Sequence, residues 1–518
     1  MNIGSEMQEI SSNNKRIAKN TLLLYFRMLV TMAVSLYTSR VVLNILGVED
    51  FGIYNVVGGI VAMFGFINGS MTSATQRYLT FELGQNNRAQ LTKVFSTSLS
   101  IHGIISFLII VLAETVGLWF LWNKMQIPAD RMNAAFWVFQ CSVAASVIMI
   151  MSVPYNAAII AHERMSAFAY ISIIEVSLKL LIVCFLRYFH TDKLILYAAL
   201  IVIVQFLIRL CYSWYCNRHF NETKYRWSWD KGLFKEMTGF ASWNMFGSLA
   251  AITFTQGLNL LLNMFFGPVV NAARGIAVQA QTAIGQFSSN FQTALNPQIT
   301  KSYATGDMEY MHGLIFRSAK FSFFQLLLLS LPVLIETKAI LTLWLKIVPD
   351  HTVVFLRIML CTTWVYAVSN PLITAASATG KIKLYQSVVG GLLLLILPIS
   401  YLCLRFGLPA YSVFIVHFVM EITAQFARLL MLRRMIRLSL REYFAKVIWS
   451  ISKVTAIALA APLAVAYWQP GEGIWNLLTI CLICAISTSM SVYWFGLTHG
   501  EKIYICSKVS SIASKFKK

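Results

Sequence analysis

Residues 194–215 read LILYAALIVIVQFLIRLCYSWY, an almost unbroken run of apolar side chains. Crossing roughly 30 Å of hydrocarbon takes about 20 mostly apolar helical residues, because a helix pairs its own backbone N–H and C=O groups away from water. Such runs recur along a chain in which 58% of the residues are hydrophobic and 12% are charged. The sequence therefore predicts an all-α integral membrane protein with about fourteen transmembrane helices.

The predicted spans fill most of the chain and are separated by short, more polar loops. They cover residues 20–44, 53–75, 93–120, 133–153, 167–188, 194–215, 240–263, 269–293, 314–335, 352–377, 384–404, 410–430, 447–467 and 474–496. The first run is too long for the core of a signal peptide, so we expect that no leader is cleaved. Nearly all of the 9 cysteines lie within spans, which favours buried apolar packing over disulfides or metal ligands.

Lysine and arginine gather in alternate loops, and the loops between them carry few. Short loops rich in these residues stay in the cytoplasm, so both termini are predicted to be cytoplasmic. A net charge of +21 that is placed in membrane-flanking loops does not indicate nucleic-acid binding. The basic cluster from Arg428 to Lys446 is instead predicted to touch anionic lipid headgroups.

The two halves of the chain resemble each other when one is shifted by about 220 residues. The matches in order are Gly47 with Gly267, Thr80 with Thr300, Pro154 with Pro371, Arg164 with Lys381, and Gln205-Phe206 with Gln425-Phe426. A repeat of six spans returns the chain to its starting side, so the halves should run parallel. This predicts two six-helix lobes around a central cavity, with two extra C-terminal helices outside them.

The predicted organisation follows from the repeat and from the loops. It comprises a cytoplasmic tail at 1–19, an N-lobe at 20–217, a cytoplasmic linker at 218–239, a C-lobe at 240–436, the two extra spans at 437–496 and a basic cytoplasmic tail at 497–518. Pro154 and Pro371 fall in equivalent spans, and proline kinks a helix by removing an amide donor. The two kinks are interpreted either as static packing features or as hinges that let the lobes bend.

Ionisable groups inside spans are costly unless they face water or a partner, so their depth decides how they are interpreted. Arg27, Arg40 and Arg274 lie far enough inside their spans to line a cationic cavity, although each could also extend to the headgroups. Four further cations lie within about two turns of a span end and are expected to reach the headgroups. They are Arg209, Lys320, Arg357 and Lys453.

Two pairs with i, i+4 spacing lie deep in their spans. Glu175 and Lys179 share one helix face, either as a neutral structural pair or as a pair from which an anion could free Lys179. His417 and Glu421 are either a hydrogen-bonded core pair or part of a proton relay, because a histidine beside a carboxylate titrates near physiological pH. We therefore name Glu175, His417 and Glu421 as candidates for ion coupling.

The first eighty residues carry a motif that resembles the opening of Wzx-type bacterial polysaccharide flippases, which belong to the multidrug, oligosaccharidyl-lipid and polysaccharide exporter superfamily. The span count and the six-plus-six repeat are also similar to that group. Val48 departs from the pattern, because proline is frequent at its position. The motif consists of Asn20-Thr21-Leu22, Arg27, Leu46-Gly47, Asp50-Phe51-Gly52, Tyr54-Asn55 and Arg77.

The resemblance implies a flippase that moves undecaprenyl-pyrophosphate-linked oligosaccharide, such as an O-antigen unit of lipopolysaccharide, from the cytoplasmic to the outer leaflet by alternating access. It implies a multi-pass protein of the bacterial cytoplasmic (inner) membrane, with anionic lipids and polysaccharide assembly proteins as partners. Lipid II flippases of the superfamily use arginines of the first and eighth spans on the pyrophosphate, and Arg27, Arg40 and Arg274 lie in those spans here. With Lys179, they form the candidate substrate site, since guanidinium groups suit phosphate oxygens.

Two other functions remain open. A cation-coupled drug antiporter of the same superfamily would need Glu175 and Glu421 to face the cavity unpaired. A membrane polysaccharide polymerase or ligase would normally need a large catalytic loop outside, and the outer segments near 121–132 and 336–351 are short. We expect no enzyme activity, catalytic residue, cofactor or metal site. No phosphate-binding sequence G-x-x-x-x-G-K-[ST] occurs, so transport would draw on an ion gradient or on removal of the product.

Overall fold

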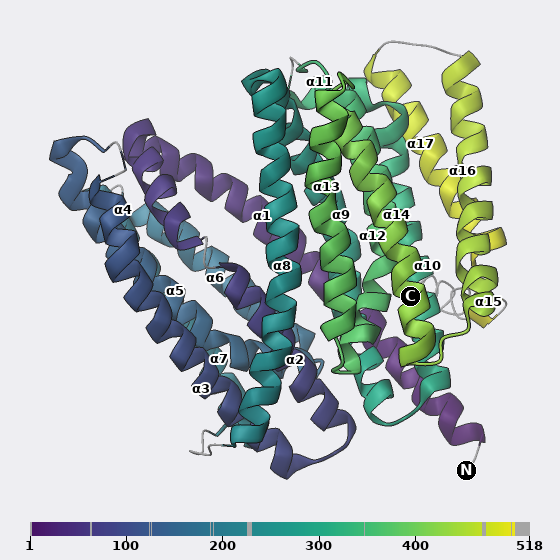
Figure 1. Ribbon diagram of the computed structural model, residues 1–518, viewed down its shortest axis with the longest axis horizontal. Coiled ribbons are helices and arrows are strands. Elements are labelled where there is room, and N and C mark those ends of the chain that lie inside the picture. Colours follow the sequence, from purple (N-terminus) through teal and green to yellow (C-terminus); the bar gives the residue numbers. More distant parts are fainter. Residues whose placement is uncertain are drawn as a thin grey trace, which may run out of the picture. The chain divides into compact units, whose positions relative to one another are not determined.

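The computed structural model describes residues 3–62, 65–123, 125, 127–186, 188–189, 191–224, 230–345, 348–468, 473–498 and 500–502. These residues form helices joined by short turns, and they contain no strand (Figure 1). Twelve helical segments among them are long and apolar enough to cross a membrane. The chain is therefore a multi-pass membrane protein with the all-α fold that the apolar runs predict.

Contacts divide the chain into two compact units. Unit 1 contains Met1–Leu249, Ala294–Asp307 and Gly380–Lys383, and unit 2 contains Ala250–Thr293, Met308–Thr379 and Leu384–Lys518. The helices of unit 1 are α1 (Ile3–Ala62), α2 (Gly65–Gly84), α3 (Arg88–Leu112), α4 (Leu118–Asn123), α5 (Met132–Ala161), α6 (Met165–Leu186) and α7 (Lys193–His219). Both α8 (Lys231–Phe266) and α9 (Pro268–Ala304) run from one unit into the other.

Unit 2 contains the remaining helices. They are α10 (Met308–Ile335), α11 (Thr337–Leu345), α12 (Thr352–Ala378), α13 (Lys383–Arg405), α14 (Ser412–Met435), α15 (Leu440–Tyr443), α16 (Trp449–Trp468) and α17 (Ile474–Ser491), with Lys383 itself in unit 1. Helix α12 packs between α10 and α14, whereas α16 and α17 pack on each other and on α10 (Figure 1). The last two helices are thus additional to the bundle of unit 2, as the sequence predicts.

Unit 1 is held by α5 against α7 and by α1 against α6. Arg131, just before α5, ties two carboxylates together: its Nη2 lies 2.5 Å from Asp50 of α1, and its Nη1 lies 2.7 Å from Asp192, the N-cap of α7. Burial alone would raise the pKa of the Asp192 carboxyl, but the hydrogen bonds from Arg131 and from backbone N–H groups hold it below its usual value. This network fixes three elements at one end of unit 1.

Backbone conformation supports the internal repeat more strongly than the residue matches do. Gly47 and Gly267 have φ of 81° and 78°, and Asn86 and Gly306, also 220 residues apart, have φ of 55° and 78°. A left-handed residue is uncommon, so left-handed residues at matching positions of the two halves support the repeat. Glu163 and Gly380, which are 217 residues apart, form a third pair with φ of 58° and 75°, each two residues after the end of its helix, α5 or α12.

Several helices extend beyond the predicted spans. Helix α1 is already helical at Ile3, within the predicted tail 1–19, and α8 begins at Lys231, within the predicted linker 218–239. The second predicted span, 53–75, instead falls on the part of α1 after Gly47 and on the start of α2. The length of an apolar run predicts where the chain crosses the bilayer. The helix itself can extend beyond that run wherever it packs against other helices.

The twelve apolar segments include neither α2 nor α9, the helices that follow Gly47 and Gly267 in the two halves. Both are rich in amide and hydroxyl side chains. Polar side chains at membrane depth face a packed or wet interior rather than lipid. We therefore expect a polar binding site along α2 or α9.

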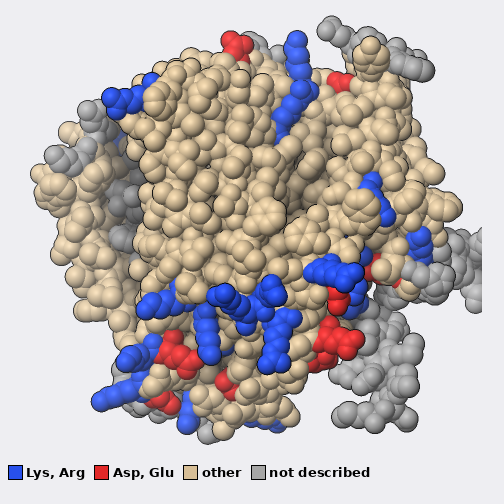
Figure 2. All heavy atoms as spheres, turned by 45° about the vertical axis from the view of Figure 1, so that its right-hand side comes forward, with Lys and Arg blue, Asp and Glu red and all other residues tan. Residues whose placement is uncertain are grey.

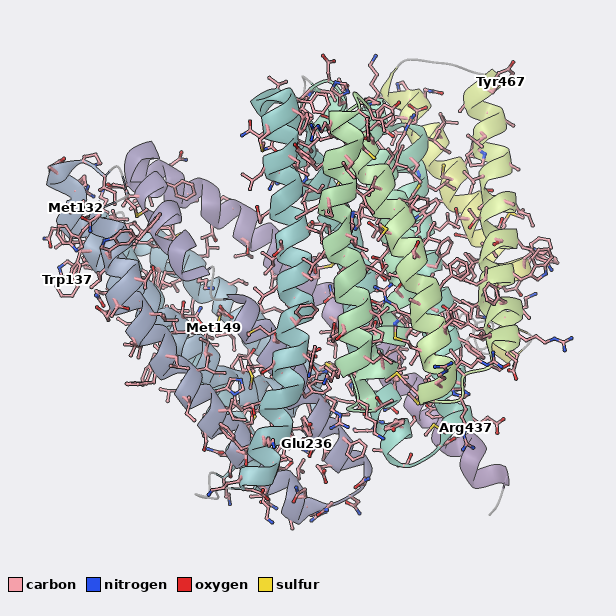
Figure 3. All side chains as sticks on the ribbon, in the orientation of Figure 1. Met132, Trp137, Met149, Glu236, Arg437 and Tyr467 are labelled. Atoms are coloured by element: carbon pink, nitrogen blue, oxygen red, sulfur yellow. The ribbon has the colours of Figure 1, made fainter. Side chains whose placement is uncertain are left out.

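Charged side chains gather at one level of the surface. On the face drawn in Figure 2, lysine and arginine form a band, and a broad area above it carries few charges. Within unit 2, Arg437, which follows α14, lies at the opposite end from Tyr467 of α16 (Figure 3). This segregation agrees with the loop pattern, while the cytoplasmic location of the basic side stays a prediction.

Two expectations about cations are wrong. Lys320 does not reach the headgroups: it is 5% exposed, and its Nζ donates to the carbonyl of Gly496. Arg428 is not part of a lipid-facing cluster, because it is 3% exposed and pairs with Glu421. Depth along a span did not reveal that neighbouring helices supply partners for these two side chains.

Candidate functional site

The polar residues of α9 line a pocket of about 450 Å³ within unit 2. We call this the α9 pocket. Helix α9 contributes Gly285 and six polar residues, which are Gln281, Thr282, Gln286, Ser288, Ser289 and Gln292. Phe254 of α8, Thr363 and Tyr366 of α12, and His417, Glu421 and Arg428 of α14 are also in its lining. Amide, hydroxyl and aromatic groups in one concave site can bind a polar ligand while excluding lipid.

The acid of this pocket is paired. Glu421 Oε1 accepts a hydrogen bond from Arg428 Nη1 at 2.7 Å, and both side chains are at most 5% exposed. Arg428 also donates to Ser369 Oγ at 3.0 Å and to the Tyr385 hydroxyl at 3.2 Å. The carboxylate and the guanidinium neutralise each other, which is the condition under which buried charges are tolerated.

His417, four residues before Glu421, packs its ring against Phe254 with the ring centroids 4.8 Å apart. The hydrogen bonds found for Glu421 run to Arg428 and not to His417. The predicted pair therefore shares a pocket without sharing a hydrogen bond. Its role in ion coupling stays a prediction.

Arg274 of α9 has a different environment. It is 6% exposed, and its guanidinium donates to Asn259 Oδ1 and, at 3.0 Å, to the carbonyl of Thr255. Among the described residues, no acidic side chain lies within ion-pair distance of it. Thr255 itself lines the α9 pocket, so a buried cation without a counter-ion adjoins the pocket.

The amide side chains of the pocket are oriented by neighbouring helices. Gln281 Nε2 donates to Thr363 Oγ1 at 2.7 Å, and Gln292 Nε2 donates to Ser322 Oγ at 3.0 Å and to the Ala367 carbonyl at 2.9 Å. Ser288 is 4% exposed, and its hydroxyl has no hydrogen-bond partner among the described residues. A buried hydroxyl in this state is a group that a bound ligand or water would satisfy.

Unit 1 contains a related arrangement. Lys179 Nζ lies 2.7 Å from Glu175 Oε1, as the i, i+4 spacing predicts, and Gln205 Nε2 donates to the same oxygen at 3.1 Å. Gln205 matches Gln425 in the repeat, and Gln425 Oε1 accepts from Ser369 in the Arg428 network. The matched glutamines thus belong to the acid–base network of their own half.

The other two predicted arginines are placed in α1. The guanidinium of Arg27 lies over the ring of Phe168, 4.6 Å from its centroid, a cation–π contact inside unit 1. Arg40 is in α1, but its side chain lies outside the described residues. Pro154 and Pro371 each lie seven residues before the last residue of their helix, α5 and α12. The matching places of the two prolines confirm that they are equivalent in the repeat, while their role as hinges stays a prediction.

Sequence reasoning missed the roles of four residues. Arg428 was assigned to the basic cluster that is predicted to touch lipid headgroups, and Glu163 was not singled out. Glu163 is an acid in an inner loop that otherwise carries cations, and this contrast was the available signal. Ser288 and Gln292 were also missed, since serine and glutamine are common in polar helices and only the packing of α12 against α10 brings their partners near.

The chain belongs to the polysaccharide biosynthesis protein family, whose model matches residues 17–304. This match covers the first span, α9 and everything between them. No curated protein matches the sequence significantly.

Solved structures show that the fold is that of multidrug transporters. An outward-facing multidrug resistance MATE family transporter of the MOP superfamily is 13% identical, with a TM-score of 0.71, covering 82% of this chain and 96% of its own. A MATE transporter in the bent conformation is 12% identical, with a TM-score of 0.73 and coverages of 86% and 97%. The Vibrio cholerae MATE transporter VcmN in its bent form is 17% identical, with a TM-score of 0.68 and coverages of 82% and 98%.

Proposed function

We propose that this protein is a flippase that carries an undecaprenyl-pyrophosphate-linked oligosaccharide from the cytoplasmic to the outer leaflet of the bacterial inner membrane. Membership of the polysaccharide biosynthesis family supports the glycan, and the transporter fold supports movement across the bilayer. Transport proceeds by alternating access and draws on an ion gradient. The lipid tail stays in the bilayer while the headgroup crosses through the protein.

The observation that carries the proposal is the buried guanidinium of Arg274 without a carboxylate partner. A buried cation is costly unless an anion compensates it. Its bonds to Asn259 and Thr255 orient it but leave its charge uncompensated. A pyrophosphate would supply the missing charge, and a guanidinium offers it a planar set of donors.

The state of the two deep acids disfavours a cation antiporter. Such a transporter would need free carboxylates, but Glu175 pairs with Lys179 and Glu421 pairs with Arg428. Both networks are neutral as they stand. In the proposed cycle Lys179 leaves Glu175 when the anionic headgroup arrives, and Arg27 and Arg40 add positive charge in the first span.

The remaining predicted roles complete the proposal. Glu421 and His417 lie in one pocket and would couple transport to proton movement, with Glu175 as their counterpart in unit 1. Pro154 and Pro371 would let equivalent helices bend. The exposed arginines that follow α14 would hold anionic lipids, and polysaccharide assembly proteins would receive the product.

Replacing Arg274 tests the proposal directly. In a flippase-deficient host, Arg274→Ala should lower glycan export roughly 10- to 100-fold, because hydrogen bonds to a charged group are worth about 1.5–3 kcal/mol. Arg274→Lys should partly restore it. The measurement is the amount of lipid-linked glycan that accumulates in the inner leaflet, at matched protein levels.

Arg357→Ala is the matched control. Arg357 is an exposed arginine of the same unit that donates to Thr337 Oγ1 at 2.9 Å and to the Ile335 carbonyl at 3.1 Å. Its loss should leave export unchanged. Full export by Arg274→Ala would remove the cationic site and, with it, the basis of the proposal.

A further inference from the structure

Unit 1 contains two short segments from the second half of the sequence. One contacts the left-handed turn at Glu163, and the other contains the left-handed residue Gly380. The first segment is the end of α9, Ala294–Asp307, and the second is the turn Gly380–Lys383. The rest of α9 and the helices on either side of that turn belong to unit 2. Whatever holds these two segments therefore keeps them within unit 1.

Glu163 holds the end of α9. Its side chain is fully buried, and its carboxylate accepts hydrogen bonds from Lys301 Nζ at 2.6 Å and from Gln298 Nε2 at 2.6 Å. On the other side Arg16 Nε of α1 lies 2.8 Å from the same carboxylate, and Asn20 Nδ2 donates to the Glu163 carbonyl. One side chain thus joins the beginning of α1 to the end of α9. We call this cluster the Glu163 latch.

The backbone at Glu163 has a strained, left-handed conformation. Its φ of 58° is left-handed, a conformation that glutamate rarely adopts and that its repeat partner, Gly380, adopts without cost. Strained residues persist where the surrounding structure requires them, often at switches. Here the left-handed turn directs the carboxylate at Lys301 and Gln298, so the strain is linked to the latch.

The second segment lies against Arg77 of α2. An added Cβ at Gly380 would lie 2.7 Å from the Arg77 guanidinium, and the φ of 75° at this position also favours glycine. The guanidinium is itself positioned over the rings of Tyr78 and Phe81, 4.4 Å and 4.8 Å from their centroids. We call this contact the Gly380 latch.

The two latches occupy equivalent positions in the two halves of the repeat. The turn after α5 holds the end of α9, and the turn after α12 meets the end of α2. Helices α2 and α9 are the equivalent polar helices of the two halves. Lys301 lies in the last turn of α9, and Arg77 lies in the second half of α2. Both residues and both turns are in segments predicted to lie on the cytoplasmic side.

We propose that the Glu163 and Gly380 turns are matching latches that hold the end of α9 and the turn after α12 in unit 1, and that both release when substrate enters from the cytoplasmic side. This rests on the proposed function, because it assigns the step at which a transporter admits its cargo. Arg16 and Lys301 remain 47% and 25% exposed while the carboxylate is fully buried. Water and anions can therefore reach the cations of the latch from outside and compete with Glu163 for them.

A thiol behind the latch reports its opening. Ala294 of α9 is fully buried against Leu24, Ile160 and Met165. In an Ala294→Cys background of the full chain in lipid nanodiscs, a membrane-impermeant maleimide should label this thiol slowly, measured at position 294 by peptide mass spectrometry. Adding Glu163→Gln should raise the labelling rate about tenfold or more, since it removes hydrogen bonds to a charged group.

A steric variant tests the same latch without changing charge. An added Cβ at Gly84 of α2 would lie 2.8 Å from Ala304 Cβ and 3.1 Å from the Lys301 carbonyl, so Gly84→Ala should push the end of α9 away and also raise labelling. The matched controls are Gly239→Ala, which meets open space, and Glu309→Gln, an exposed acid at the start of α10. Both should label like the parent.

Folded Glu163→Gln and Gly84→Ala proteins that label at the parental rate would overturn the proposal. Lowered thermal stability without faster labelling would do the same, because it would show a purely structural cluster. The assay contains no glycan, so it does not depend on the identity of the cargo. If Arg274→Ala exports normally while the latch variants open, the flippase assignment fails and the latch stands.

Discussion

At the scale of single residues, a cation's partners decide its role more than its depth does. Arg428 and Arg274 are both almost fully buried, at 3% and 6% exposure. Arg428 has a carboxylate at 2.7 Å, whereas the two recorded hydrogen bonds of Arg274 go to neutral oxygens. The first is therefore a structural charge, and the second is the cation that we propose binds an anionic ligand.

The Glu421–Arg428 pair should be essential for stability. Glu421→Gln leaves the Arg428 guanidinium buried without its counter-ion, and breaking a buried pair costs about 3–5 kcal/mol of the free energy of unfolding. We expect a large drop in the thermal unfolding temperature of the detergent-solubilised protein.

Glu442→Gln provides the comparison for that prediction. Glu442 lies 2.6 Å from Lys446, but both side chains are more than half exposed, so water replaces the lost contact. No measurable change in unfolding temperature is expected. Equal effects of the two substitutions would show that burial does not govern the Glu421 pair.

At the scale of elements, a single glycine separates the first two spans of each half. Gly47 has φ of 81° and ψ of 171°, and Gly267 has φ of 78°. The Gly47 conformation is essentially restricted to glycine. The matched glycines therefore share a left-handed backbone conformation, which a chance match between apolar helices would not require.

Gly47→Ala should destabilise the protein even though a Cβ there meets open space. The strained backbone costs of order 1–3 kcal/mol for a residue other than glycine. Gly103→Ala, in the middle of α3 and also in open space, should be neutral or stabilising by up to about 1 kcal/mol, because alanine favours a helix. Denaturation of the two variants in one detergent compares them, and a neutral Gly47→Ala would contradict the strain.

At the scale of the whole molecule, charge segregation sets the orientation in the membrane. Alkaline phosphatase, which is active only outside the cytoplasm, should be active when fused after Asp130 and inactive when fused after Asp307. Asp130 lies in a loop with few cations, and Asp307 lies directly after the α9 end that carries Lys301. Activity of the second fusion and not the first would reverse the predicted topology.

The sequence predicts much of the architecture. The apolar runs located most of the helices, and the matched glycines and prolines located the repeat, because hydrophobic length and backbone-restricted residues act locally. The pair of Glu175 and Lys179 was also predictable, since i, i+4 neighbours share a helix face.

Only the tertiary structure assigned partners to the charged residues. Lys320 binds the carbonyl of Gly496, 176 residues away, and Glu163 binds Lys301 and Gln298 from another helix. The α9 pocket likewise takes its lining from five further helices. The sequence by itself determined most of the segments that are apolar enough to cross the bilayer, because that property depends on transfer of each segment into hydrocarbon. Which buried charges are neutralised and which remain available depends on distances between helices, and those exist only once the chain is packed.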